Sequence, residues 1–209
     1  MDDLAKYWLK KLYIKDFVLG KEEYYDDAFE FLVSLEKQVK NVASKNISHE
    51  PLDLYQISKS KLEEDKSFTN GSSISFALEY KNLSLLFLAD SHPKVIAESI
   101  RMQYIEAQFP IKFDLIKISH HGCQLNTSDE LLELIDSEIY IFSTDGSSFN
   151  HPDIEVIAKV VCRPAQFKRK LFFNYPVPIA LTLDDSDLKL KYNYEINIAY
   201  NNLPTEIIL

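Results

Sequence analysis

The chain has 209 residues, of which 46% are hydrophobic and 26% are charged, and its formal net charge is −9. These values are ordinary for a globular protein, and the length suits one domain with a helical appendage. The acidic balance excludes a broadly basic surface for non-specific nucleic-acid binding, although one bound divalent ion can still dominate the charge of a local cleft.

The cysteines and the N-terminus indicate a cytoplasmic protein. Cys123 and Cys162 are the only two cysteines, which is too few for a disulfide framework, and they form no CxxC pair. The first residues are acidic, and no apolar run follows them. We therefore expect neither a signal peptide nor a transmembrane segment.

The first 69 residues are predicted to form a helical region followed by a loop, and residues 70–209 a separate α/β part. Apolar residues in 2–45 recur at spacings of three and four, which predicts two amphipathic helices. These helices either pack on a core or bind a partner. Polar residues dominate from 46 to 70, where we expect a loop with short structured pieces.

Strands and helices are expected to alternate from residue 74 onward. Residues 74–78 alternate in polarity, and 83–89 form a nearly continuous apolar run, typical of a strand covered on both faces. Further strands are predicted at 114–119 and 138–143, and helices at 93–106, 128–135 and 154–161. This order predicts an α/β architecture. Residues 170–174, 179–184 and 188–194 resemble short strands, with a hairpin turn at 184–187.

Three polar clusters follow the ends of predicted strands, where α/β proteins place ligands. They are Asp90-Ser91-His92, Ser119-His120-His121-Gly122 and Asn150-His151-Pro152. Imidazole and carboxylate groups bind divalent metals, and a carboxylate can bridge two ions. We therefore predict a site for one or two Zn (or Mn) ions, with Asp90, His120 and His151 as metal ligands.

Each cluster also has an ordinary structural interpretation. Asp90 can cap the next helix, paired histidines can bond the backbone, and His151-Pro152 can start a helix. The catalytic position is assigned to His121, which is placed to orient the substrate.

Four blocks in this order resemble the second half of a metallo-β-lactamase-fold hydrolase domain, closest to the branch of competence-type DNA-uptake proteins. The blocks are NGSSI from Asn70, LLFLADSHP around Asp90, FDLIKISHHGCQLNTS, and IYIFSTDGSSFNHPDIEVI. The resemblance covers a little under half of the chain. It implies a partial αββα architecture, Asp90 as the ligand that bridges the two metals, and His151 as the late ligand.

The family's HxHxDH signature is absent, since residues 1–69 contain only His49 as a histidine. Two functions from different classes stay open. The first is a metal-dependent hydrolase of the phosphodiesterase or nuclease kind, with a nucleotide or nucleic-acid substrate. The second is a non-catalytic or split-domain subunit that acts as an interaction module. The resemblance extends to proteins of bacterial defence systems. A homodimer or a protein partner would then complete the domain, because missing strands leave a sheet edge and apolar surface exposed.

Overall fold

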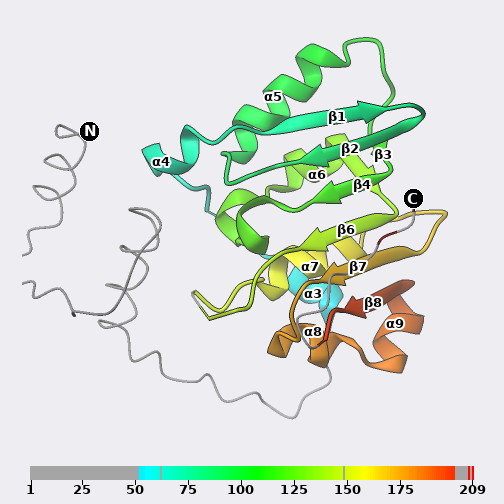
Figure 1. The fold of residues 1–209 in the computed structure, drawn as a ribbon. Coiled ribbons are helices and arrows are strands. Elements are labelled where there is room, and N and C mark those ends of the chain that lie inside the picture. The colour runs from blue at the N-terminus through cyan, green and yellow to red at the C-terminus, as the bar shows by residue number, and fades with distance from the viewer. Residues whose placement is uncertain (1–51, 62, 148, 201–206, 208) are drawn as a thin grey trace, which may run out of the picture. The chain divides into compact units, whose positions relative to one another are not determined.

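The computed structural model describes residues 52–61, 63–147, 149–200, 207 and 209 (Figure 1). The described residues belong to one compact unit, Ser48–Leu209. The helices expected within 2–45, and with them His49, lie outside the described residues.

A six-stranded sheet runs through this unit in the order β1-β2-β4-β6-β7-β8. β1 and β2 form an antiparallel hairpin, whereas the next four strands are each parallel to their neighbour. Lys81 and Asn82 make the hairpin turn between β1 and β2, and Lys81 adopts the left-handed conformation with φ 54°. The strands are β1 (Phe76–Tyr80), β2 (Leu83–Phe87), β4 (Leu115–Lys117), β6 (Ile139–Phe142), β7 (Arg169–Phe173) and β8 (Tyr194–Ile198).

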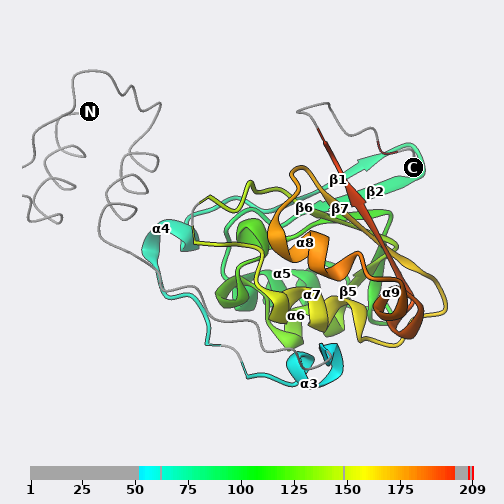
Figure 2. The ribbon, with the colours of Figure 1, turned by 90° about the horizontal axis from the view of Figure 1, so that it is seen from below.

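Helices α5 (Pro93–Gln103), α6 (Asp129–Leu134) and α7 (Ile154–Val161) connect these strands and lie on one face of the sheet (Figure 2). Two three-residue strands, β3 (Ile111–Phe113) and β5 (Ile135–Ser137), pair in parallel beside them. The predicted α/β class is thus confirmed. None of the described helices is long and apolar enough to cross a membrane.

The core lies between the sheet and this helical layer. Every second side chain of β6 and β7 points into it: Tyr140, Phe142, Leu171 and Phe173 are at most 1% exposed. They pack against the apolar faces of α6 and α7 in one continuous cluster. Apolar burial on this scale is the main source of the folding free energy.

A buried ion pair lies at the end of this core. The Asp136 carboxylate contacts Arg169 at 2.6 Å and Arg163 at 3.0 Å, and it accepts a hydrogen bond from the Tyr140 hydroxyl. Burial alone would raise the pKa of Asp136, but the two guanidinium groups and the tyrosine hold it below its usual value. The pair thus links β5 to β7, which belong to different sheets.

The segment before β1 packs against the same unit. Helix α3 (Leu54–Ser58) lies on α7, and buried Lys159 donates to Ser58 O at 3.0 Å and to Asp129 at 2.7 Å. Helix α4 (Phe68–Gly71) then leads into β1. The region predicted as a loop thus carries two short helices that reach the α/β part.

Two of the three strands predicted in the tail are wrong. Residues 179–184 and 188–194 fall largely on helices α8 (Pro178–Leu183) and α9 (Ser186–Tyr192). Pro178 begins α8, while Asp185 caps the N-terminus of α9 by accepting from two backbone N–H groups. These end signals outweigh the apparent alternation of the apolar residues. The predicted hairpin turn at 184–187 therefore joins two helices.

Candidate metal centre

The three predicted polar clusters converge at the end of the sheet where the parallel strands have their carboxyl ends. They follow the carboxyl ends of the adjacent parallel strands β2, β4 and β6, so the fold brings their loops together. The ring centroids of His120 and His121 are 6.0 Å apart, and those of His120 and His151 are 5.8 Å apart. Three imidazoles that are up to 31 residues apart in the chain thus form one cluster.

The turn that carries two of these histidines has an unusual backbone. His120, His121 and Gly122 follow one another with φ values of 43°, 58° and 89°, in the left-handed region. Such conformations cost free energy at non-glycine residues and persist only when the surroundings enforce them. Here His120 N–H donates to Ala89 O at 2.8 Å, and Asp153 N–H donates to Gly122 O at 3.0 Å.

Gly122 is required at this turn for a second reason. A Cβ atom added to it would overlap Pro152 and would lie 3.0 Å from Phe142 Cδ1. The histidine turn and the His151-Pro152 segment therefore touch through a position that only glycine can occupy. This contact sets how closely the imidazole of His151 approaches the imidazole of His120.

All three histidines have Nδ1 engaged by an oxygen atom of the protein. His120 Nδ1 lies 2.8 Å from Asn126 Oδ1, His121 Nδ1 lies 2.5 Å from Ser143 O, and His151 Nδ1 lies 3.3 Å from an Asp153 carboxylate oxygen. These oxygens accept hydrogen bonds, so Nδ1 of each ring carries a proton; Asn70 Nδ2, which lies 3.4 Å from His120 Nδ1, donates to Asp65 instead. In a ring that is neutral, Nε2 is then the nitrogen left to hold a ligand or accept a proton, as in histidines that bind metals.

Asn126 orients His120 from a fully buried position. Its amide Nδ2 faces oxygen atoms, namely an Asp65 carboxylate oxygen at 3.1 Å and Asp90 O at 3.0 Å, so its Oδ1 must be the atom that faces His120. Asp65 also accepts from Asn70 Nδ2 at 2.5 Å. A carboxylate, an amide and an imidazole thus form a chain that leads to the site.

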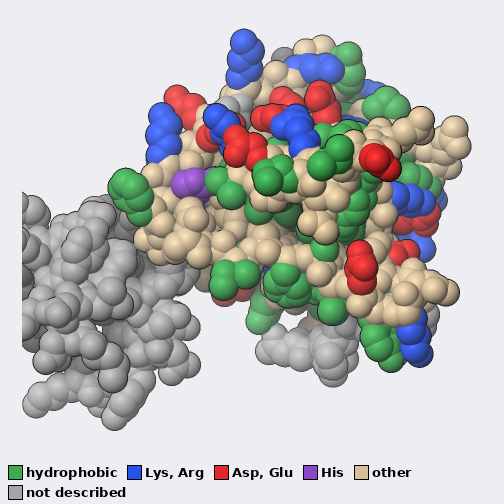
Figure 3. All heavy atoms as spheres, turned by 90° about the horizontal axis from the view of Figure 1, so that it is seen from above, with side chains coloured by type: hydrophobic (Ala, Val, Ile, Leu, Met, Phe, Trp, Pro, Cys, Tyr) green, Lys and Arg blue, Asp and Glu red, His purple; other side chains and the backbone are tan. Residues whose placement is uncertain are grey.

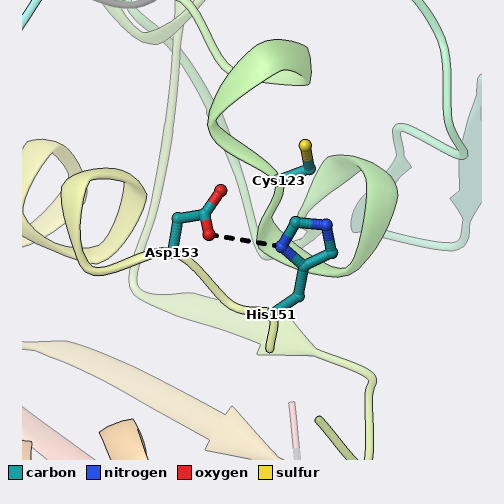
Figure 4. A group of neighbouring side chains, drawn as sticks. All are labelled: Cys123, His151 and Asp153. Atoms are coloured by element: carbon teal, nitrogen blue, oxygen red, sulfur yellow. Dashed lines mark hydrogen bonds and ion pairs between the residues drawn. The ribbon is translucent and has the colours of Figure 1, made fainter. Parts of the chain in front are cut away.

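His151 lies beside Cys123 and Asp153 (Figure 4). In the part of the chain that the structure describes, these three form the one group of three metal-binding side chains with ligand atoms within 4.8 Å of one another. Burial lowers the pKa of His151, but hydrogen bonds to Asp153 and to Cys123 raise it more, to about 9. The second Asp153 oxygen accepts from Gln124 N–H at 2.8 Å, which holds this carboxylate in place.

Asp90 and Lys117 supply opposite charges near the cluster. Lys117 is half-buried on β4; burial lowers its pKa, whereas the negative charge of Asp90 raises it. Burial likewise lowers the pKa of His121, which also feels the charges of Lys117 and Asp90. Since a lowered pKa favours the neutral imidazole, His121 is suited to accept a proton or to bind a cation.

The fold thus brings the rings of His120, His121 and His151 near one another, and Asp90 interacts electrostatically with Lys117 and His121. Among the described residues, the ligand atoms of Asp90, His120 and His151 do not form a group within 4.8 Å of one another. Asp90 does not cap α5, because the N-cap position is His92. Nor does Pro152 begin α7, which is preceded by Asp153 at its N-cap. His121 does bond a backbone carbonyl, as its ordinary structural interpretation expects.

Sequence reasoning missed several residues that shape the cluster. Only Lys117 carried a signal, as a charge inside an otherwise apolar strand. The others stand in turns without a distinctive pattern: Asp65, Cys123, Asn126 and Asp153. Comparison with known proteins adds no further constraint, since no family model, no curated protein and no solved structure matches the chain.

Proposed function

We propose that the protein is a metal-dependent hydrolase of the metallo-β-lactamase kind that acts on small phosphodiesters. In this proposal Asp90, His120 and His151 hold the ion, and His121 faces the substrate. The observation that carries the proposal is the arrangement of the three imidazoles. Each has Nδ1 fixed by a separate protein oxygen, so that Nε2 of His120 and of His121 is left for a ligand. His151, whose pKa is raised to about 9 by Asp153 and Cys123, gives up a proton when it binds the ion.

The residues fit a transition metal by separation and by chemistry. The ring centroids of His120 and His151 are 5.8 Å apart, a separation that two imidazoles bound to one ion can have. The described group with ligand atoms within 4.8 Å of one another is Cys123, His151 and Asp153, so in this proposal Asp90 and His120 move towards His151 when the ion binds. Nitrogen and carboxylate donors suit Zn or Mn, and the nearby Cys123 thiol further favours zinc. When bound, such an ion stabilises negative charge that develops on phosphate oxygens.

The remaining groups supply what a phosphodiester substrate requires. The Lys117 ammonium is a fixed positive charge within electrostatic reach of Asp90 and His121, and it can pair with a phosphate oxygen. His121, with its lowered pKa, can take up a proton during the reaction. The net charge of −9 disfavours long polyanions, so we propose a nucleotide-sized substrate rather than extended nucleic acid.

Turnover of bis(4-nitrophenyl) phosphate by the zinc- or manganese-loaded full chain tests this function. His120→Ala should lose both bound metal and turnover, whereas His121→Ala should keep the metal and lose at least about tenfold in kcat. His92→Ala is the matched control, because the His92 ring bonds Ser67 O at 2.9 Å, makes no cap hydrogen bond to α5 and lies outside the ligand set. Equal turnover in all four proteins would refute the assignment.

One observation favours a second candidate, a non-catalytic subunit that acts as an interaction module. The Lys117 ammonium can neutralise Asp90 without any metal. In that case the wild-type chain would bind no metal. We place either form in the cytoplasm, since both cysteines are free thiols. The resemblance to proteins of bacterial defence systems fits this candidate as well.

A further inference from the structure

Strand β1 is an exposed edge of the sheet. It pairs only with β2 among the described strands, and all five of its residues are exposed. An edge strand of this kind leaves every second N–H and C=O on its free side without a strand partner. Phe76, Leu78 and Tyr80 are nevertheless large and apolar, and each is at least 46% exposed. Natural edge strands that stay single usually carry charges or prolines instead.

Apolar exposure is concentrated around this edge. Eight of the 17 large hydrophobic side chains that are exposed in the described residues lie between Ile74 and Phe109. Figure 3 views this edge, which carries β1 and α5, and shows hydrophobic side chains reaching the surface. Val95 and Met102 are seven residues apart on α5, so they share one helix face, and both are exposed. Patches of this kind mark interaction surfaces.

A groove of about 630 Å³ runs between β1 and α5. Ile74 and Phe76 line one side of it and Val95 and Ile96 the other, with small serines between them. A strand added to the free edge of β1 would close this groove from outside. The groove would then receive apolar side chains from the added element.

We propose that β1 pairs antiparallel with β1 of a second copy of this chain, across a two-fold axis at Leu78. The sequence Phe-Ala-Leu-Glu-Tyr of β1 is self-complementary in this register. Leu78 lies opposite the partner's Leu78, and Phe76 lies opposite the partner's Tyr80, on the same face of the sheet. Aromatic and aliphatic pairs of this kind are favourable cross-strand contacts.

The register also suits the single charge of the strand. Glu79 lies opposite the partner's Ala77, so no like charges are directly opposed. The same two-fold axis brings α5 near its copy on the helical face, where Val95 and Met102 are otherwise exposed. A two-fold contact repeats every interaction, so the exposed strands of both copies are covered at once.

Sedimentation velocity of the full chain at about 5–100 µM tests the pairing, and we expect a dimer. Leu78→Lys introduces two directly opposed ammonium groups and should weaken the dimer at least about tenfold. Leu190→Lys is the control, since Leu190 is exposed on α9 away from this edge and its replacement should leave the dimer intact. Circular dichroism checks that each variant is folded.

Disulfide cross-linking tests the register independently of stability. Under mild oxidation Leu78→Cys should form a covalent dimer, because directly opposed Cβ atoms lie about 4.5–5.5 Å apart. Glu79→Cys should not, since Glu79 faces Ala77. Both variants carry Cys162→Ser, because Cys162 is only partly buried, whereas Cys123 is buried. A wild type that is still monomeric at about 100 µM would overturn the proposal. A dimer that survives Leu78→Lys, or one that Leu78→Cys fails to cross-link, would overturn it too.

Discussion

Asn126 is the residue whose replacement tests the site most sharply. It is fully buried, and its side chain donates to Asp65 and to Asp90 O while it accepts from His120 Nδ1. Asn126→Ala removes one bond to a charged group, worth about 1.5–3 kcal/mol, and two neutral bonds, each worth about 0.5–1.5 kcal/mol. Small relaxations recover part of this loss, so we expect a destabilisation of roughly 3 kcal/mol.

Asn126→Asp separates hydrogen bonding from packing. It keeps the size of the side chain but turns the donor that faces Asp65 and Asp90 O into an acceptor. A buried carboxylate then opposes the partly buried carboxylate of Asp65, so near neutral pH this variant should be less stable than Asn126→Ala. Protonation of the new carboxyl group removes the conflict, so the gap should narrow as the pH falls toward 5.

Urea unfolding followed by far-ultraviolet circular dichroism measures both variants. Zinc titration of the folded variants gives a second readout, because loss of the group that fixes a ligating histidine typically weakens metal binding about 10- to 100-fold. A cost below about 1 kcal/mol for Asn126→Ala, or wild-type stability of Asn126→Asp at pH 7, would refute the network described for His120.

Three further predictions concern the core and the histidine turn. Asp136→Asn leaves Arg169, which is 3% exposed, without its carboxylate, so unfolding should become easier by about 3–5 kcal/mol; little change in urea midpoint would contradict the pairing. The same pair makes stability depend on pH in acid. Because the pKa of Asp136 in the folded protein lies below its usual value of 3.8, the ion pair stabilises the protein at pH values above 3.8, and this contribution is lost as the pH falls below 3.8 through the folded-state pKa. In acid titrations of unfolding, the wild type should therefore lose more stability than Asp136→Asn. Gly122→Ala should destabilise the protein by at least about 2 kcal/mol, because the added Cβ overlaps Pro152 and the residue has a positive φ. Gly146→Ala should cost less, because its added Cβ would lie 3.3 Å from the nearest atom. Equal thermal midpoints of the two variants would argue against the close contact at Gly122.

Long apolar patterns made much of the fold predictable. The apolar run at 83–89, which contains β2, and the helix at 154–161 could be predicted from the sequence, because buried strands and amphipathic helices leave a clear apolar pattern. The strands β3 and β5 were missed, since three residues are too few to show any alternation. In the tail, local end signals at Pro178 and Asp185 decided in favour of helix, and the alternation of apolar residues was misleading.

The candidate site likewise contains some residues that could be predicted from the sequence and others that could not. Asp90, His120, His121 and His151 could be singled out because rare side chains follow strand ends, where the topology of parallel strands gathers them. Asn126 could not, because its role depends on a turn that brings it against residues up to 61 positions away. Such contacts between groups far apart in the chain follow from tertiary packing and leave no local pattern.

Metal content of the purified full chain, measured by elemental mass spectrometry together with protein concentration, tests the central claim most directly. We predict close to one or two equivalents of zinc or manganese in the wild type, and loss of the metal in a folded Asp90→Ala variant. Absence of metal from the wild type, even after incubation with either ion, would contradict the metal centre, as would unchanged content in the variant.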